Sequence, residues 1–270
     1  MAINDIVLTS AIRSNLASLQ NTSGLLDRTQ IRLSTGREVN SALDDAINFF
    51  AARGLENRAG DLDALLDGMG QAVQTLKAAN EGLELITSFV EQLKAIANSA
   101  RDAGPGSAES VVFEGDFDDI RTQIDQVIQD TGYRGINLLN GGSLTVEFNE
   151  DATSLITVAG VTFNAAGLSL SAADFSTDAS ITAALAEIDT ALSSLRATAQ
   201  TFGTNLTTIQ NRESFTKNII DTLSEGANKL VLADQNEESA NLLALQTRQQ
   251  LGVTSLSLAS QASQAILNLF

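Results

Sequence analysis

The sequence predicts a mainly α-helical protein: a long antiparallel coiled coil or helical bundle formed by its N- and C-terminal segments, with a small β-hairpin insert. Three observations predict this class. Proline, the strongest helix breaker, occurs once in 270 residues, at Pro105. Two apolar series with heptad spacing lie far apart in the chain, and a short alternating stretch lies between them. Long helices are therefore permitted on both sides of a small β element.

The first apolar series occupies residues 62–100. Apolar residues recur there every seven residues, and a second set follows three residues after the first. This pattern is typical of positions a and d in a coiled-coil or bundle helix. The alternative is an ordinary bundle helix in a single globular domain. The two sets are Leu62, Met69, Leu76, Leu83, Val90 and Ala97, and Leu65, Ala72, Ala79, Ile86, Leu93 and Ala100.

The second series occupies residues 185–230 and is interrupted for one heptad at Glu213 and Thr216. Two seams of similar length that are joined by a small insert are satisfied most simply by antiparallel pairing with each other. We therefore predict one intrasubunit seam between them. Its members are Leu62, Leu76, Leu83 and Val90 from the first series, and Leu192, Leu195, Phe202, Leu206 and Ile209 from the second.

The segment between the two series has a different character. Residues 140–142 (Asn-Gly-Gly) are a turn signal, and alternating or β-rich runs follow at 144–148, 155–158 and 161–163. We predict a β excursion over about 143–165 and a loose link that extends to about 179. The domain organisation expected from this is a terminal coiled coil (1–42 with 230–270), a helical bundle (43–142 with 181–229) and a short β-rich insert (143–180).

The two ends of the chain are poor in charge. Residues 239–270 contain one charged residue, Arg248, and residues 1–26 contain only Asp5 and Arg13. The C-terminal helix is apolar on all sides, which indicates burial on all sides. The N-terminal helix has an apolar stripe that must also be buried. Two helices cannot bury each other completely, so the remaining faces are expected to meet other subunits; the alternative is a central helix pair inside a large monomer.

The composition of the chain argues against catalysis, metal binding and nucleic-acid binding. Without histidine or cysteine the chain lacks the commonest acid–base residue, thiol nucleophiles, disulfides and the usual zinc ligands. Its net charge of −17 offers no basic stripe for nucleic acid. Asp44 and Asp45 have no nucleophile motif beside them, and residues 116–119 lack the later ligands of a calcium loop. We expect no enzyme activity, no cofactor, no metal and no nucleic-acid partner.

The chain also lacks the signals of membrane insertion. No run of about 18 apolar residues occurs, so no membrane span is expected. The first residues, Met-Ala-Ile-Asn-Asp, have no positively charged region, so we expect no cleavable signal peptide.

Three ordered motifs resemble those of bacterial flagellins. Residues 32–36 (Arg-Leu-Ser-Thr-Gly), followed by 39–42 (Val-Asn-Ser-Ala) and 44–46 (Asp-Asp-Ala), resemble the N-terminal signature of the family. Residues 133–141 (Tyr-Arg-Gly-Ile-Asn-Leu-Leu-Asn-Gly) resemble the stretch where flagellins leave their conserved core. The C-terminus resembles the terminal helix of the family through Gln249, Gln250, Gly252, Leu256, Ala259, Gln261, Gln264, Leu267 and Leu269.

The resemblance implies a structural subunit that polymerises into the bacterial flagellar filament for swimming motility, without catalytic residues. Both termini would pair as a coiled coil in the wall of the inner tube. The short insert implies a minimal flagellin without large outer domains. The implied partners are copies of itself, the flagellar export apparatus, a secretion chaperone, and the hook-associated and cap proteins. The protein would be secreted into the extracellular filament. The alternative is a hook–filament junction protein of the same superfamily.

The predicted assembly interface combines the N-terminal apolar stripe with residues of the motifs. It consists of Ile12, Leu16, Leu19, Leu26, Leu33, Asn40, Asp44, Asp45, Gln249, Gln250, Gly252, Leu256, Gln261, Leu267, Leu269 and Phe270.

Overall fold

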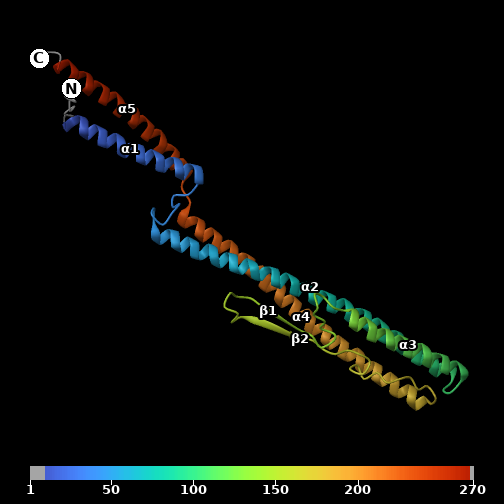
Figure 1. Cartoon of the computed structure of the whole chain (residues 1–270). Coiled ribbons are helices and arrows are strands. Elements are labelled where there is room, and N and C mark those ends of the chain that lie inside the picture. Colours follow the sequence, from blue (N-terminus) through green and yellow to red (C-terminus); the bar gives the residue numbers. More distant parts are fainter. Residues whose placement is uncertain (1–9, 268–270) are drawn as a thin grey trace, which may run out of the picture. The chain divides into compact units, whose positions relative to one another are not determined.

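The structure is a computed structural model that describes residues 10–267, where it contains five helices and two strands (Figure 1). The predicted class, mainly α with a small β-hairpin, is confirmed. The elements in chain order are α1 (Ser10–Thr35), α2 (Ala46–Ala103), α3 (Ala108–Asp130), β1 (Ser143–Glu147), β2 (Leu155–Ala159), α4 (Asp178–Val231) and α5 (Gln235–Leu267).

The chain divides into two compact units. Unit 1 comprises Met1–Asn57 and Thr222–Phe270, and unit 2 comprises Arg58–Asp221. The long helices α2 and α4 each contribute to both units. The finer division into a terminal coiled coil, a bundle and an insert stays a prediction.

In unit 2, α2 and α4 pair in antiparallel directions, as predicted. Lys94 Nζ lies 2.7 Å from Asp189 Oδ1, and one heptad further along α2, Arg101 Nε lies 3.3 Å from Asp178 Oδ1. The residue numbers rise along α2 while those of the partners fall along α4. The two helices therefore run in opposite directions.

The hydrophobic core of unit 2 follows this helix pair. Residues at the heptad positions are buried because positions a and d face the partner helix. Six of the nine predicted seam residues are at most 1% exposed: Leu76, Leu83, Val90, Leu195, Phe202 and Ile209. Leu62 and Leu192 are also buried, and Leu206 packs against the core while partly exposed. Helix α3 and the loop after it cover the same core with Phe117, Ile124, Ile128, Leu138 and Leu139.

The β-hairpin lies in the predicted insert. β1 and β2 pair antiparallel, with Thr145 opposite Thr157, and the inward Leu144, Val146 and Val158 join the core of unit 2. The third β-rich run, 161–163, forms no strand, contrary to the sequence prediction. Its backbone amides instead donate to the loop after α3: Val161 N to Leu138 O at 2.7 Å and Phe163 N to Leu139 O at 3.0 Å. The loop thus takes the hydrogen bonds that a third strand would have needed.

Candidate assembly surface on the terminal helices

Helices α1 and α5 lie side by side in unit 1 (Figure 1). Arg32 near the end of α1 pairs with Glu238 at the start of α5, and Leu19 lies against Gly252 further along. The two helices are therefore antiparallel. A Cβ on residue 252 would lie 2.8 Å from Leu19 Cδ2, which is too close for a normal contact. The close approach of α1 and α5 at this point therefore requires glycine at position 252.

The contact between α1 and α5 follows a heptad pattern. Apart from Arg32, which pairs with Glu238, the less exposed positions of α1 are Ile12, Asn15, Leu19, Thr22, Leu26, Thr29 and Leu33. Those of α5 are Glu238, Leu242, Leu245, Gln249, Gly252, Leu256 and Ala259. Both series alternate spacings of three and four residues, as in a coiled coil.

The described part of the α1–α5 pair has no fully buried hydrophobic side chain. Its buried residues are Thr22, Thr29 and Glu238, which are all polar. The Thr22 hydroxyl donates to Ser18 O at 2.8 Å, within its own helix. Several large hydrophobic residues are instead exposed: Leu16, Leu25, Ile31, Leu243, Leu251, Val253 and Leu258. The pair therefore buries too little apolar surface to be strongly stable alone.

One face of α5 is apolar and is not covered by the residues that the structure describes. It consists of Leu243, Thr247, Leu251, Thr254 and Leu258, and we call it the outer face of α5. Successive members are three or four residues apart, which aligns them on one side of a helix, about half a turn from the side that faces α1. The Thr247 and Thr254 hydroxyls donate to carbonyls of their own helix, both at 2.9 Å. These threonines therefore need no polar partner from outside.

A turn connects α1 to α2 and is held by two aspartates. Asp44 Oδ2 accepts hydrogen bonds from the backbone amides of Asn40 and Ser41 and from the Ser41 hydroxyl, at 3.2, 3.0 and 3.1 Å. These hydrogen bonds, those from Ser41 above all, hold the pKa of Asp44 below its ordinary value of 3.8. Asp45 caps α2 by accepting from Asn48 N at 3.0 Å. Both carboxylates thus act locally to shape the turn.

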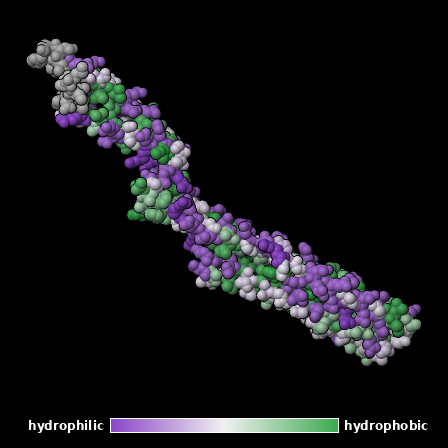
Figure 2. Space-filling model, in the orientation of Figure 1, coloured by the Kyte–Doolittle hydropathy of each residue, from purple (hydrophilic) through white to green (hydrophobic). Residues whose placement is uncertain are grey.

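This turn presents hydrophobic side chains to the surface. Leu43 is 98% exposed, Ile47 82% and Phe50 64%. Figure 2 shows hydrophobic side chains gathered over the turn that precedes α2. Sequence reasoning missed these three residues, although their spacing of four and three residues was a visible signal.

The predicted interface residues are distributed unequally over unit 1. Ile12, Leu19, Leu26, Leu33, Gln249 and Leu256 are half-buried between α1 and α5, whereas Leu16, Gln250 and Gln261 are exposed. Asn40 donates to Arg37 O at 2.9 Å within the turn. The side chain of Leu267, and Leu269 and Phe270 entirely, lie outside the described residues. The roles of all these residues in assembly stay predictions.

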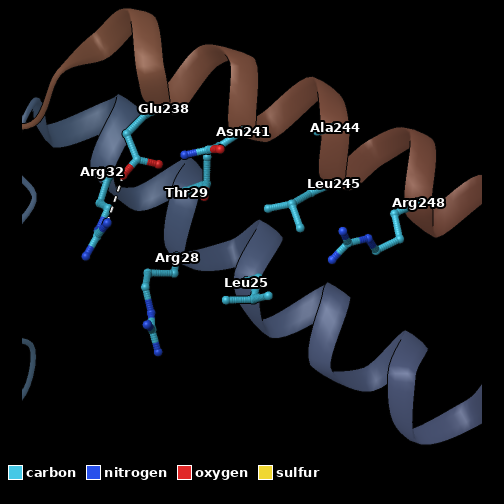
Figure 3. Close-up of a pocket in the computed structure, with 9 residues that line it drawn as sticks. All are labelled: Leu25, Arg28, Thr29, Arg32, Glu238, Asn241, Ala244, Leu245 and Arg248. Atoms are coloured by element: carbon cyan, nitrogen blue, oxygen red, sulfur yellow. Dashed lines mark hydrogen bonds and ion pairs between the residues drawn. The ribbon is translucent and has the colours of Figure 1, made fainter. Parts of the chain in front are cut away.

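A groove of about 300 Å³ lies between α1 and α5 (Figure 3). Residues from α1 and α5 line it: Leu25, Arg28, Thr29, Arg32, Glu238, Asn241, Ala244, Leu245 and Arg248. Arg32 Nη1 lies 2.8 Å from Glu238 Oε1 and 3.5 Å from Glu38 Oε1. Sequence reasoning did not find this groove, because its arginines come from helices more than 200 residues apart in the chain.

The described residues contain no cluster of three or more His, Cys, Asp and Glu side chains that could hold a metal ion. Among the helices in that part of the chain, none combines the length and the apolar run needed to cross a membrane.

In the described part of unit 1, the α1–α5 pair buries no hydrophobic side chain and exposes an apolar face, as expected of a structural subunit that assembles with other subunits. Comparison with known proteins agrees. Residues 3–143 match the bacterial flagellin N-terminal helical region, and residues 185–270 match the bacterial flagellin C-terminal helical region. The chain belongs to the bacterial flagellin family and is a structural subunit of the flagellar filament.

Similar proteins match over the whole length. Flagellin FljM of Caulobacter vibrioides is 33% identical over 273 residues, covering 100% of both chains. A flagellin of Brucella melitensis is 32% identical over 280 residues, covering 98% of both. Among solved structures, the crystal structure of a Bacillus cereus flagellin has a TM-score of 0.49 at 14% identity and covers 54% of this chain and 86% of that one.

Proposed function

We propose that this flagellin polymerises by burying the α1–α5 pair, and above all the outer face of α5, against copies of itself. The observation that carries the proposal is the exposure of Leu243, Leu251 and Leu258, which are 62–67% exposed on a helix with no charge on that face. Burial of each of these leucines against a neighbouring copy contributes about 1–2 kcal/mol.

Polymer growth follows from the kind of contact. The outer face of α5 and the turn around Leu43 are different patches, so a contact that joins unlike patches on successive copies is head-to-tail. Such a contact gives an open helical polymer when its rotation does not close a ring. The predicted interface residues, from Ile12 to Phe270, would lie in this contact in the wall of the inner tube.

The proposed partners before and during assembly are the flagellar export apparatus and a secretion chaperone, followed by the hook-associated and cap proteins at the growing end. The uncovered apolar face supports the need for a chaperone, since an exposed apolar face favours unwanted association before export. The protein would be secreted and would function in the extracellular filament.

The test is seeded growth observed by electron microscopy. A triple variant with Leu243→Gln, Leu251→Gln and Leu258→Gln is expected to raise the critical concentration for growth at least about a hundredfold. Its circular dichroism should still show the helices of unit 2. A control variant with Val111→Gln, Val112→Gln and Leu155→Gln changes similarly exposed residues of unit 2 and should grow filaments.

Normal growth of the α5 variant would contradict the proposal. The hook–filament junction alternative predicts a different result for the unmodified chain: it would bind the seeds and stall, without long filaments.

A further inference from the structure

The groove between α1 and α5 carries an excess of positive charge in an acidic protein. Three arginines line it, and the only acidic residue in the lining is Glu238, whose side chain is 10% exposed and paired with Arg32. Figure 3 shows Leu25, Leu245, Thr29 and Asn241 between the two helices, with the arginine side chains extending around them. We call this the arginine groove.

Several polar groups in the arginine groove have no hydrogen-bond partner among the residues that the structure describes. Within the described residues, neither Arg28 nor Arg248 makes a hydrogen bond or an ion pair, although the charge of Arg28 contributes to the lowered pKa of Asp44. The Thr29 hydroxyl and the Asn241 amide also make no hydrogen bond there. The buried Nε of Arg32 likewise has no hydrogen-bond partner there. These side chains supply several donors, and a carboxylate, which only accepts hydrogen bonds, complements such a set.

The charge of the chain is divided unequally between the units. Unit 2 contains 23 Asp and Glu against 9 Lys and Arg, which accounts for −14 of the net charge of −17. Unit 1, which holds the arginine groove, contains 10 acidic and 7 basic residues. A neighbouring copy therefore offers many carboxylates, and the lining of the groove, with three arginines and one glutamate, attracts them.

We propose that the arginine groove receives a carboxylate side chain from a second copy of this chain during assembly. This inference rests on the proposed function, because the copies must meet before the groove can be filled. Arg28 and Arg248, which make no ion pair within the described residues, supply the positive charge that attracts the acidic side chain. The neighbouring copy would also cover Leu25, which is 42% exposed, and Leu245, so that less water would screen the interaction. The contact thereby orients one copy on the next and makes growth sensitive to salt.

The first test removes the two arginines of the groove that make no hydrogen bond or ion pair within the described residues. An Arg28→Gln, Arg248→Gln variant breaks no ion pair within the described residues, so its circular dichroism should match that of the unmodified chain. Its critical concentration for seeded growth should rise on the order of tenfold or more, as expected for the loss of charge-assisted hydrogen bonds. A Lys77→Gln, Arg196→Gln variant makes the same change in net charge at exposed positions of unit 2 and should grow normally. Equal growth of the two variants would overturn the inference.

The second test identifies the partner group. An Arg248→Lys variant keeps the charge and introduces an amine, which a carbodiimide joins to a touching carboxylate. Filaments are grown from a mixture of ¹⁴N- and ¹⁵N-labelled copies, so mass spectrometry distinguishes links between copies from links within one copy. The expected result is a mixed-isotope link from position 248 to an Asp or Glu, which unmodified filaments do not form. A link to Glu238 of the same copy alone, or no link in well-formed filaments, refutes the inference.

A small anion could satisfy the same donors. Inorganic phosphate is therefore titrated into unassembled protein while the NMR signals of residues 25–32 are followed. Phosphate binding together with the absence of a link between copies would make the groove a small-anion site and would overturn the inference. Failure of the unmodified chain to grow filaments at all would instead count against the proposed function, which separates the two.

Discussion

Leu83 and Leu85 lie two residues apart on α2 and offer a direct test of the helix orientation in unit 2. Leu83 is 1% exposed in the seam with α4, whereas Leu85 is 44% exposed. Replacing each by alanine makes the same chemical change with the same change in helix propensity. Any difference in the free energy of unfolding therefore reports burial.

The structure determines the expected size of the difference. Leu83→Ala removes three buried carbon atoms, which corresponds to about 2.4 kcal/mol of transfer free energy. The cavity left in a core that includes Ile86 and Leu139 raises the cost to about 3–4 kcal/mol. Leu85→Ala loses only part of the transfer term and leaves no closed cavity, so about 1 kcal/mol is expected.

The assay is urea unfolding of the unassembled protein, followed by circular dichroism. With a urea dependence of about 2 kcal/mol per molar, the midpoint should fall by about 1.5–2 M for Leu83→Ala and by about 0.5 M for Leu85→Ala. Equal shifts, or a larger shift for Leu85→Ala, would mean that α2 presents a different face to α4, and the reasoning from heptad positions would be refuted.

Two further predictions concern the backbone and pH. Gly82→Ala should destabilise unit 2 by about 1–3 kcal/mol in the same urea assay, because the new Cβ would lie 2.5 Å from Thr131 Cγ2. Gly68→Ala should instead stabilise unit 2 by about 0.5–1 kcal/mol, because its new Cβ would meet no neighbouring side chain within 4 Å. A change of the same sign in the free energy of unfolding for both variants would contradict the packing described. The turn that holds Asp44 should persist below pH 3.8. Because the pKa of Asp44 is lower in the folded protein than in the unfolded chain, the stabilisation that its carboxylate gives the turn is complete above the unfolded-state pKa. This stabilisation is lost only as the pH falls through the lower, folded-state pKa. The Ser41 amide signal in NMR should therefore change below pH 3.8, and should not do so in Asp44→Asn; a midpoint at or above 3.8 would count against the hydrogen bonds described.

The sequence predicted the seams of unit 2 well, because a buried helix face repeats with the helix itself. Leu83 and Leu85 are equally hydrophobic, yet their heptad positions distinguish the buried residue from the exposed one. In α1 the apolar residues do not account for the whole contact. Leu16, a predicted assembly residue, is 39% exposed, and the contact with α5 also passes through the polar Asn15, Thr22 and Thr29. Hydrophobicity alone does not locate a seam that contains polar residues.

The sequence by itself thus determined the class of protein, the antiparallel helix pair and the family, because heptad spacing, charge-poor ends and ordered motifs are properties of the chain. Tertiary structure alone decided which carbonyl groups would accept from the backbone amides of Val161 and Phe163, since the loop at Leu138 and Leu139 had to lie beside them. It also decided that Arg28 and Arg248, on helices distant in the chain, would line one groove. Periodicity shows which side of a helix is buried, but only the approach of two helices determines which side chains share a groove.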